Sequence, residues 1–70
     1  MTHLSSFISS SPDRDSVVFE IWAGNDQLAE VFREPGESLE IELYSPAEGG
    51  KWNFELEELV SLSNQAVNNL

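Results

Sequence analysis

Apolar and acidic residues alternate strictly between positions 38 and 44. A period of two is typical of a β-strand that buries one side and exposes the other. This is the most regular pattern in the chain, so we expect a half-buried strand here. Its apolar residues, Leu39, Ile41 and Leu43, are expected to face the core, while Glu40, Glu42 and Tyr44 face outwards.

Two further strands are predicted before this one. Residues 16–23 are rich in β-branched and aromatic side chains and end at Gly24-Asn25-Asp26, a strong turn signal. Residues 27–34 form the next apolar stretch, which ends at Pro35 and Gly36. Proline fixes the backbone for the second position of a turn, and glycine accepts the positive φ of the third. Consecutive strands with short connections favour an antiparallel meander.

The facing of residues 27–34 is ambiguous, because either Ala29 and Val31 or Leu28 and Phe32 can point inwards. The second arrangement places Glu30 between two buried positions, and an unpaired buried carboxylate is costly, whereas an exposed phenylalanine is not. We therefore expect Ala29 and Val31 inside, with Leu28 and Phe32 outside. The Pro-Gly turn favours the opposite facing, since a short loop there sets the strand register.

A helix is predicted from near Asn53 or Glu55 to the last residues. Residues 51–54 form either a short fourth strand or an extended lead into this helix, and Trp52 and Phe54 are expected to anchor its start against the sheet. Apolar and small residues follow at i, i+3, i+4 spacing and form one stripe. The stripe consists of Leu56, Leu59, Val60, Ser63, Ala66, Val67 and Leu70.

Residues 1–15 are polar and serine-rich, with Leu4, Phe7 and Ile8 as their only sizeable apolar side chains after the initial methionine. This composition predicts a flexible N-terminal arm. Residues 16–70 are then expected to form a single small domain. The predicted fold class is α+β, an antiparallel three- to four-stranded β-meander with one C-terminal α-helix packed on one face.

Charge narrows the functional classes. The chain has 70 residues, 13 of them acidic and 3 basic, for a formal charge of −10, and it has no cysteine. Direct binding of nucleic acid needs basic side chains against phosphate, and an anionic membrane surface repels such a chain. No apolar run approaches the roughly 20 residues of a spanning helix. We therefore expect neither a nucleic-acid nor a membrane partner, and a cytoplasmic location.

No catalytic, cofactor or metal site is expected from the sequence. His3 falls in the predicted arm, away from any nucleophile that it could activate. Asp13 and Asp15 lack the spacing of a calcium loop. Residues 49–51, Gly-Gly-Lys, lack the first glycine and the following Ser or Thr of a phosphate-binding loop. Paired glutamates on so short a chain lack the cleft that glycosidase chemistry needs.

The outer face of the predicted sheet is the candidate site, because it combines carboxylates with exposed aromatic rings. Acidic groups attract a basic protein partner, and aromatic rings that become buried on binding slow its dissociation. The alternatives are a solvated face that keeps an acidic protein soluble, and a homodimer formed through an edge strand. The expected partner-binding residues are Glu20, Trp22, Glu30, Phe32, Glu34, Glu40, Glu42 and Tyr44.

The chain carries four segments, residues 17–22, 28–32, 39–44 and 52–56. In residue pattern and order, these segments resemble small acidic bacterial immunity proteins. Such proteins neutralise contact-dependent and other polymorphic toxins, many of them nucleases. The resemblance implies a non-enzymatic inhibitor that occludes a basic site on a toxin or nuclease domain. Two alternatives use the same charge differently: a nucleic-acid mimic that blocks a DNA-binding defence enzyme, and a small homodimeric adaptor domain.

Overall fold

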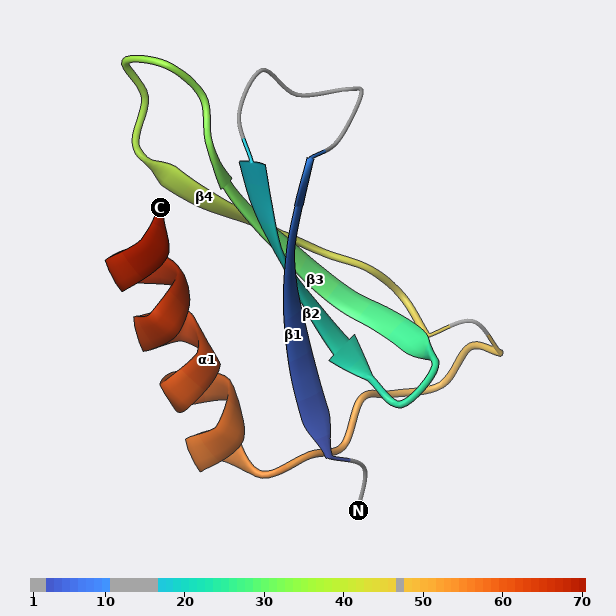
Figure 1. Cartoon of the computed structure of the whole chain (residues 1–70). Coiled ribbons are helices and arrows are strands. Elements are labelled where there is room, and N and C mark those ends of the chain that lie inside the picture. The colour runs from blue at the N-terminus through green and yellow to red at the C-terminus, as the bar shows by residue number, and fades with distance from the viewer. Residues whose placement is uncertain (1–2, 11–16, 47) are drawn as a thin grey trace.

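The computed structural model describes residues 3–10, 17–46 and 48–70. It contains four strands and one helix: β1 (Leu4–Ser10), β2 (Val17–Ala23), β3 (Asp26–Arg33), β4 (Leu39–Leu43) and α1 (Leu56–Asn69). The strands form one sheet in the order β1-β2-β3-β4, and each neighbouring pair is antiparallel. The predicted fold class, an antiparallel meander with a C-terminal helix packed on one face, is confirmed (Figure 1).

The prediction of a flexible arm is wrong for residues 4–10, which form β1. This strand pairs with β2 along its whole length, from Leu4 opposite Ala23 to Ser10 opposite Val17. Leu4 packs against the core from the helix side of the sheet. The fourth strand therefore comes from the N-terminal part, and residues 51–54 are the extended lead into the helix. Residues 11–16, the remainder of the predicted arm and the first residue of the domain, lie outside the described residues.

The β2–β3 hairpin turns tightly at Gly24, whose positive φ of 63° suits glycine. Beyond the turn the register shifts, because Trp22 pairs with Gln27 whereas Ile21 pairs with Ala29. Leu28 is thus the additional residue of a β-bulge on β3. Ala29 is fully buried, as predicted, but Leu28 is buried in the same core cluster rather than facing outwards. The bulge interrupts the alternation on which the outward prediction rested.

The core lies between one side of the sheet and α1. Trp52 and Phe54 pack against it, which confirms their predicted anchoring role. α1 starts after Glu55, whose backbone is extended and whose side chain makes no cap hydrogen bond. No helix among the described residues has the length and apolar character to cross a bilayer. The buried core residues are Phe19, Ile21, Leu28, Ala29, Val31 and Ala66.

The apolar residues of β4 are less covered than predicted. They lie on the helix side, because Ile41 is opposite Val31 and Leu43 is opposite Ala29. Leu39 packs against the core, but Ile41 is 48% exposed and Leu43 is 68% exposed. Both residues face the predicted side of the sheet but are poorly covered, since α1 lies nearest to β1, at the opposite edge of the sheet (Figure 1).

Candidate functional site

Three glutamates lie in line across the sheet, on the side away from α1. Glu20 of β2 is directly opposite Glu30 of β3, and Glu30 is directly opposite Glu42 of β4. We call these three residues the acidic row. Neighbouring strands are about 4.8 Å apart, so the row extends over about 10 Å. Like charges placed directly opposite one another destabilise a sheet, so folding alone does not favour this arrangement.

Neutral donors contact two carboxylates of the acidic row, those of Glu20 and Glu30. Ser9 Oγ, from β1, and Trp22 Nε1 both donate to Glu20, and the second of these bonds is 2.9 Å long. Tyr44 Oη donates to Glu30 Oε2 over 2.7 Å. Because a hydroxyl or an indole carries no charge, the two donors fix the direction of the Glu20 carboxylate without cancelling its charge.

Two aromatic rings stand beside the row at its β1 end. Trp22 is half-buried, and its ring meets that of Phe7 edge to face, with the centroids 6.4 Å apart and the planes at 85°. Phe7 is exposed and on the same side of the sheet, because it pairs with Glu20. The sequence analysis missed Phe7 as a site residue because it assigned β1 to the arm. Its alternation with serine was the available signal.

Phe32 does not belong to the exposed surface, and its prediction as an anchor is wrong. Its side chain is only 4% exposed. Val18, one step along the β2–β3 ladder from the Phe19–Val31 pair and thus beside Phe32, is also buried. Burying a phenylalanine side chain is worth about 1.5–3 kcal/mol, so folding gains from enclosing it. On the side of the sheet away from α1, the surface near Phe32 is therefore buried, whereas a partner can reach the acidic row.

The remaining predicted residues lie at the margin of the site. Glu40 is exposed on β4, directly opposite Phe32 and two positions from Glu42, so it extends the acidic surface along β4. Glu34 is half-buried and lies in the turn after β3, where its carbonyl accepts a hydrogen bond from the Glu37 N–H. Of the predicted residues, the structure brings together Glu20, Trp22, Glu30, Glu42 and Tyr44.

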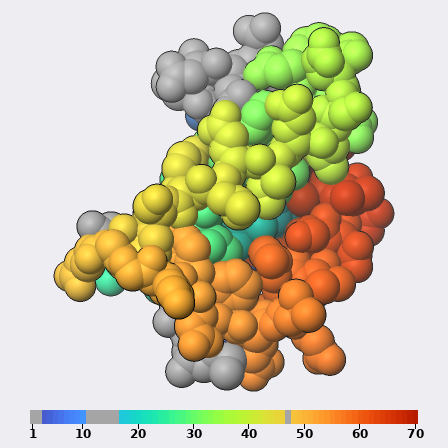
Figure 2. Space-filling model, turned by 180° about the vertical axis from the view of Figure 1, so that it is seen from behind, coloured from blue at the N-terminus to red at the C-terminus, as the bar shows by residue number. Residues whose placement is uncertain are grey.

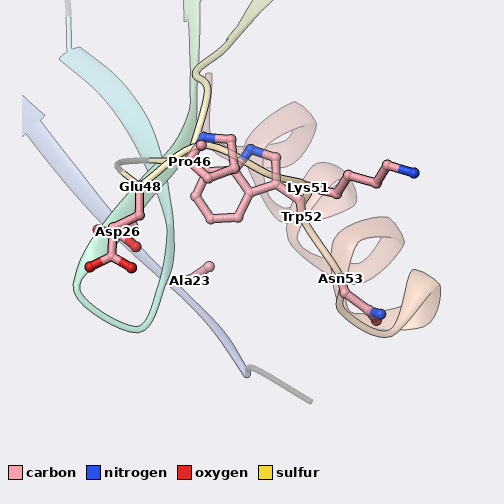
Figure 3. Close-up of a pocket in the computed structure, with 8 residues that line it drawn as sticks. Ala23, Asp26, Pro46, Glu48, Lys51, Trp52 and Asn53 are labelled. Carbon is pink, nitrogen blue, oxygen red and sulfur yellow. The ribbon is translucent and has the colours of Figure 1, made fainter.

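An open hollow of about 340 Å³ lies elsewhere, between the β2–β3 turn and the segment that leads into α1. Figure 3 shows Asp26 and Glu48 on one side of Trp52, with Lys51 extending away from them. Two carboxylates and an indole offer no complete set of metal ligands. Within residues 3–10, 17–46 and 48–70, no three His, Cys, Asp or Glu side chains are grouped to hold a metal ion.

His3 lies apart from the acidic row, just before β1. Its Nδ1 is 3.1 Å from Glu58 Oε1 of α1, and the imidazole is largely exposed. This contact joins the beginning of the first strand to the first turn of the helix. It is a surface contact, and it supports the packing of β1 and α1 rather than a chemical step.

Comparisons of the chain with protein-family models, with curated proteins and with solved structures each gave no match. The resemblance to immunity proteins therefore stays a prediction, and the functional argument depends on the acidic row and the rings beside it.

Proposed function

We propose that this protein is a non-enzymatic inhibitor of the immunity or antitoxin type, acting in the cytoplasm. It binds a basic protein partner, such as the nuclease domain of a toxin, through the acidic row and the neighbouring rings. The observation that carries this proposal is the alignment of Glu20, Glu30 and Glu42 on three adjacent strands. The Lys and Arg side chains of a cationic cleft complement such a row, because their charge is opposite in sign.

The charge of the chain sets how the encounter proceeds. With a formal charge of −10, the protein attracts a basic surface over distances longer than a contact. The attraction is screened over about 8 Å at physiological ionic strength, so the association rate falls as salt is added. Carboxylates in this role raise the association rate and exclude acidic partners, more than they slow dissociation.

The rings supply the contact that slows dissociation. Trp22 is held by its hydrogen bond to Glu20 and by the edge of Phe7, so little side-chain freedom remains to be lost on binding. Tyr44 is held in the same way by Glu30. Tryptophan and tyrosine are the residues that most often dominate binding energy at interfaces. The inhibitor then acts by covering the basic site and keeping substrate out.

The test compares two double variants with the same net charge. Glu30→Gln with Glu42→Gln neutralises two members of the acidic row. Glu37→Gln with Glu57→Gln neutralises two exposed glutamates outside it, in the β3–β4 turn and in α1. Each protein is immobilised and used to capture partners from the native host. Captured proteins are then expressed alone or together with each variant, and host growth is measured.

We expect wild type and the Glu37/Glu57 variant to retain a basic protein and to suppress its toxicity. The Glu30/Glu42 variant should associate about tenfold more slowly, and this loss should shrink at higher salt. Equal capture by both variants would show that the acidic row is not the binding site. A captured protein that is harmless when expressed alone would overturn the assignment as an inhibitor.

A nucleic-acid mimic is the second candidate, and the regular spacing of the row favours it. Carboxylates held at fixed intervals form a series of negative charges similar to that of DNA phosphates. A groove that binds phosphates can therefore also bind such a row. Short duplex DNA added during capture separates the two functions. Competition by DNA supports the mimic, and capture that is indifferent to DNA supports the toxin inhibitor.

A further inference from the structure

An apolar groove runs between β4 and α1, on the side of the sheet opposite the acidic row. It is lined by Val31 of β3, by Leu39, Glu40 and Ile41 of β4, and by Ser63 and Val67 of α1. Leu43 continues the apolar line along β4, and Val60 continues it along the helix, two turns before Val67. Figure 2 shows green and teal atoms of the inner strands between the yellow β4 segment and the orange-red helix.

The residues along this groove are unusually exposed for apolar side chains. Ile41, Val60 and Val67 are each about half exposed, and Leu43 is more so. They come from β4 and α1, and two of them, Ile41 and Val67, line the groove, which has a volume of about 200 Å³. Contiguous apolar surface of this kind marks interaction sites more often than single exposed residues do.

β4 is also an edge strand, because the strand order ends with it. The Tyr44 N–H donates to the Leu28 carbonyl over 2.9 Å, so Leu28 and Tyr44 form a hydrogen-bonded pair. Such pairs alternate along an antiparallel ladder. The backbone groups of Glu40 and Glu42 therefore point to β3, and those of Leu39, Ile41 and Leu43 point to the free edge. An edge of this kind accepts an added strand.

Charge decides which strand fits. A second copy paired antiparallel about Ile41 would place Glu40 directly opposite the Glu42 of the other copy, and the reverse, so both pairs repel. Two chains with a charge of −10 each add to that repulsion. A strand that carries Lys or Arg on the side of Glu40 and Glu42 is instead attracted by these two carboxylates. Its other side must be apolar, since it lies over Ile41 and Leu43 and reaches towards the helix.

We infer that the free edge of β4 binds an extended segment of a basic protein, in which apolar residues alternate with Lys or Arg. The backbone of the segment extends the sheet, its apolar side chains enter the groove beside Val60 and Val67, and its cations lie beside Glu40 and Glu42. This inference goes beyond the proposed function, because it uses the free edge of β4 and the helix side of the sheet, and it shares only Glu42 with the acidic row.

The probe is a short synthetic peptide in which Ile and Lys alternate, labelled for fluorescence anisotropy. Two comparison peptides isolate the two contributions to binding. One carries an N-methyl group on every Ile amide, the amides that would pair with Leu39, Ile41 and Leu43, so it retains the charge and removes the ladder donors. The other replaces each Ile with Ser, which retains the charge and the backbone but removes the apolar side chains.

Three variants of the full chain locate the binding surface. Val60→Ser with Val67→Ser makes the helix side of the groove polar, and Leu43→Pro removes one outward N–H of the edge. Proline is tolerated on an edge strand where its nitrogen faces solvent, so Leu43→Pro is expected to fold. It keeps the inference testable if the Val60/Val67 variant unfolds. Leu56→Ser removes an exposed apolar side chain from the first turn of α1, outside the groove, and is the control. Circular dichroism verifies that each variant is folded.

We expect the alternating peptide to bind wild type and Leu56→Ser equally. Binding should weaken about tenfold or more with either groove variant and with either comparison peptide. Equal binding of the N-methylated peptide would show that no backbone ladder forms with β4, and would overturn the inference. A wild type that sediments as a dimer, with a monomeric Val60/Val67 variant, would assign the groove to a second copy instead. Neither result depends on Glu20 or Glu30, so the proposed function stands or falls separately.

Discussion

The indole N–H of Trp52 donates a 2.7 Å hydrogen bond to the backbone carbonyl of Tyr44, eight positions earlier in the chain. The bond closes the loop between β4 and α1, in which Gly49 and Gly50 adopt positive φ angles of 80° and 83°. The same ring packs against the core cluster. One side chain therefore fixes both the path of the loop and the point from which α1 departs.

Replacing Trp52 with Phe should retain an aromatic ring against the core and remove the bond to Tyr44. A hydrogen bond of this kind contributes about 1 kcal/mol, and the partner carbonyl is near solvent, which limits the loss. We expect the free energy of unfolding to fall by about 1 kcal/mol in urea titrations. Tyr44→Phe leaves the carbonyl in place and removes only the hydroxyl bond to Glu30, so it measures that second bond separately. No change in Trp52→Phe would mean that ring packing alone holds the loop.

Phe32 and Phe7 lie on the same side of the sheet but differ in burial, so they provide a matched pair. Phe32→Ala should cost about 3–5 kcal/mol, because it leaves a cavity. Phe7→Ala removes an exposed ring and its contact with Trp22, which is worth about 0.5–1.5 kcal/mol. Thermal unfolding followed by circular dichroism measures both changes. Similar losses for the two variants would contradict the burial of Phe32.

Ile21 and Ile41 test how far α1 covers the helix side of the sheet. Ile21 is completely buried, and Ile41 is about half exposed. Ile21→Ala should therefore lower the free energy of unfolding by about 2–5 kcal/mol, and Ile41→Ala by less than half as much. Denaturant titration of both variants gives the comparison. If Ile41→Ala proves as costly as Ile21→Ala, the furrow between β4 and α1 is filled in solution.

Proline tests whether residues 4–10 form a strand in solution. Neighbouring N–H groups of an antiparallel strand point alternately to the partner strand and away from it. One of Ser5→Pro and Ser6→Pro must therefore break a bond to β2, and the other replaces an N–H that faces the free edge of β1. We expect a clear loss of stability in one variant and a small effect in the other. Two equally harmless prolines would favour a flexible arm.

Much of the fold is predictable from local patterns. The alternation at 38–44 predicted β4, the Gly-Asn-Asp turn predicted the β2–β3 hairpin, and the stripe from Leu56 to Leu70 predicted α1. β1 escaped prediction because serine has little strand preference of its own. Its ladder to β2 and its contact with α1 supply the stabilisation, and neither is visible in a window of seven residues.

The site was predictable only as far as strand alternation reaches. It placed Glu20, Glu30 and Glu42 on one side, but their alignment in one row depends on register between strands. The bulge at Leu28 and the burial of Phe32 depend on packing, which a single strand's pattern does not contain. The exposure of Ile41 likewise depends on where α1 crosses the sheet.

The pairing of the first strand with the last element has a consequence for synthesis. His3 and Glu58 are 55 positions apart in the chain yet in contact. The hairpins of β1 to β4 join neighbours in sequence, so they can form on the ribosome as the chain emerges. The apolar side of the sheet stays exposed to solvent until the residues of α1 have been translated. For this protein, translation of α1 is therefore the step that permits the interior to close, and stalling before it leaves the apolar side of the nascent sheet exposed.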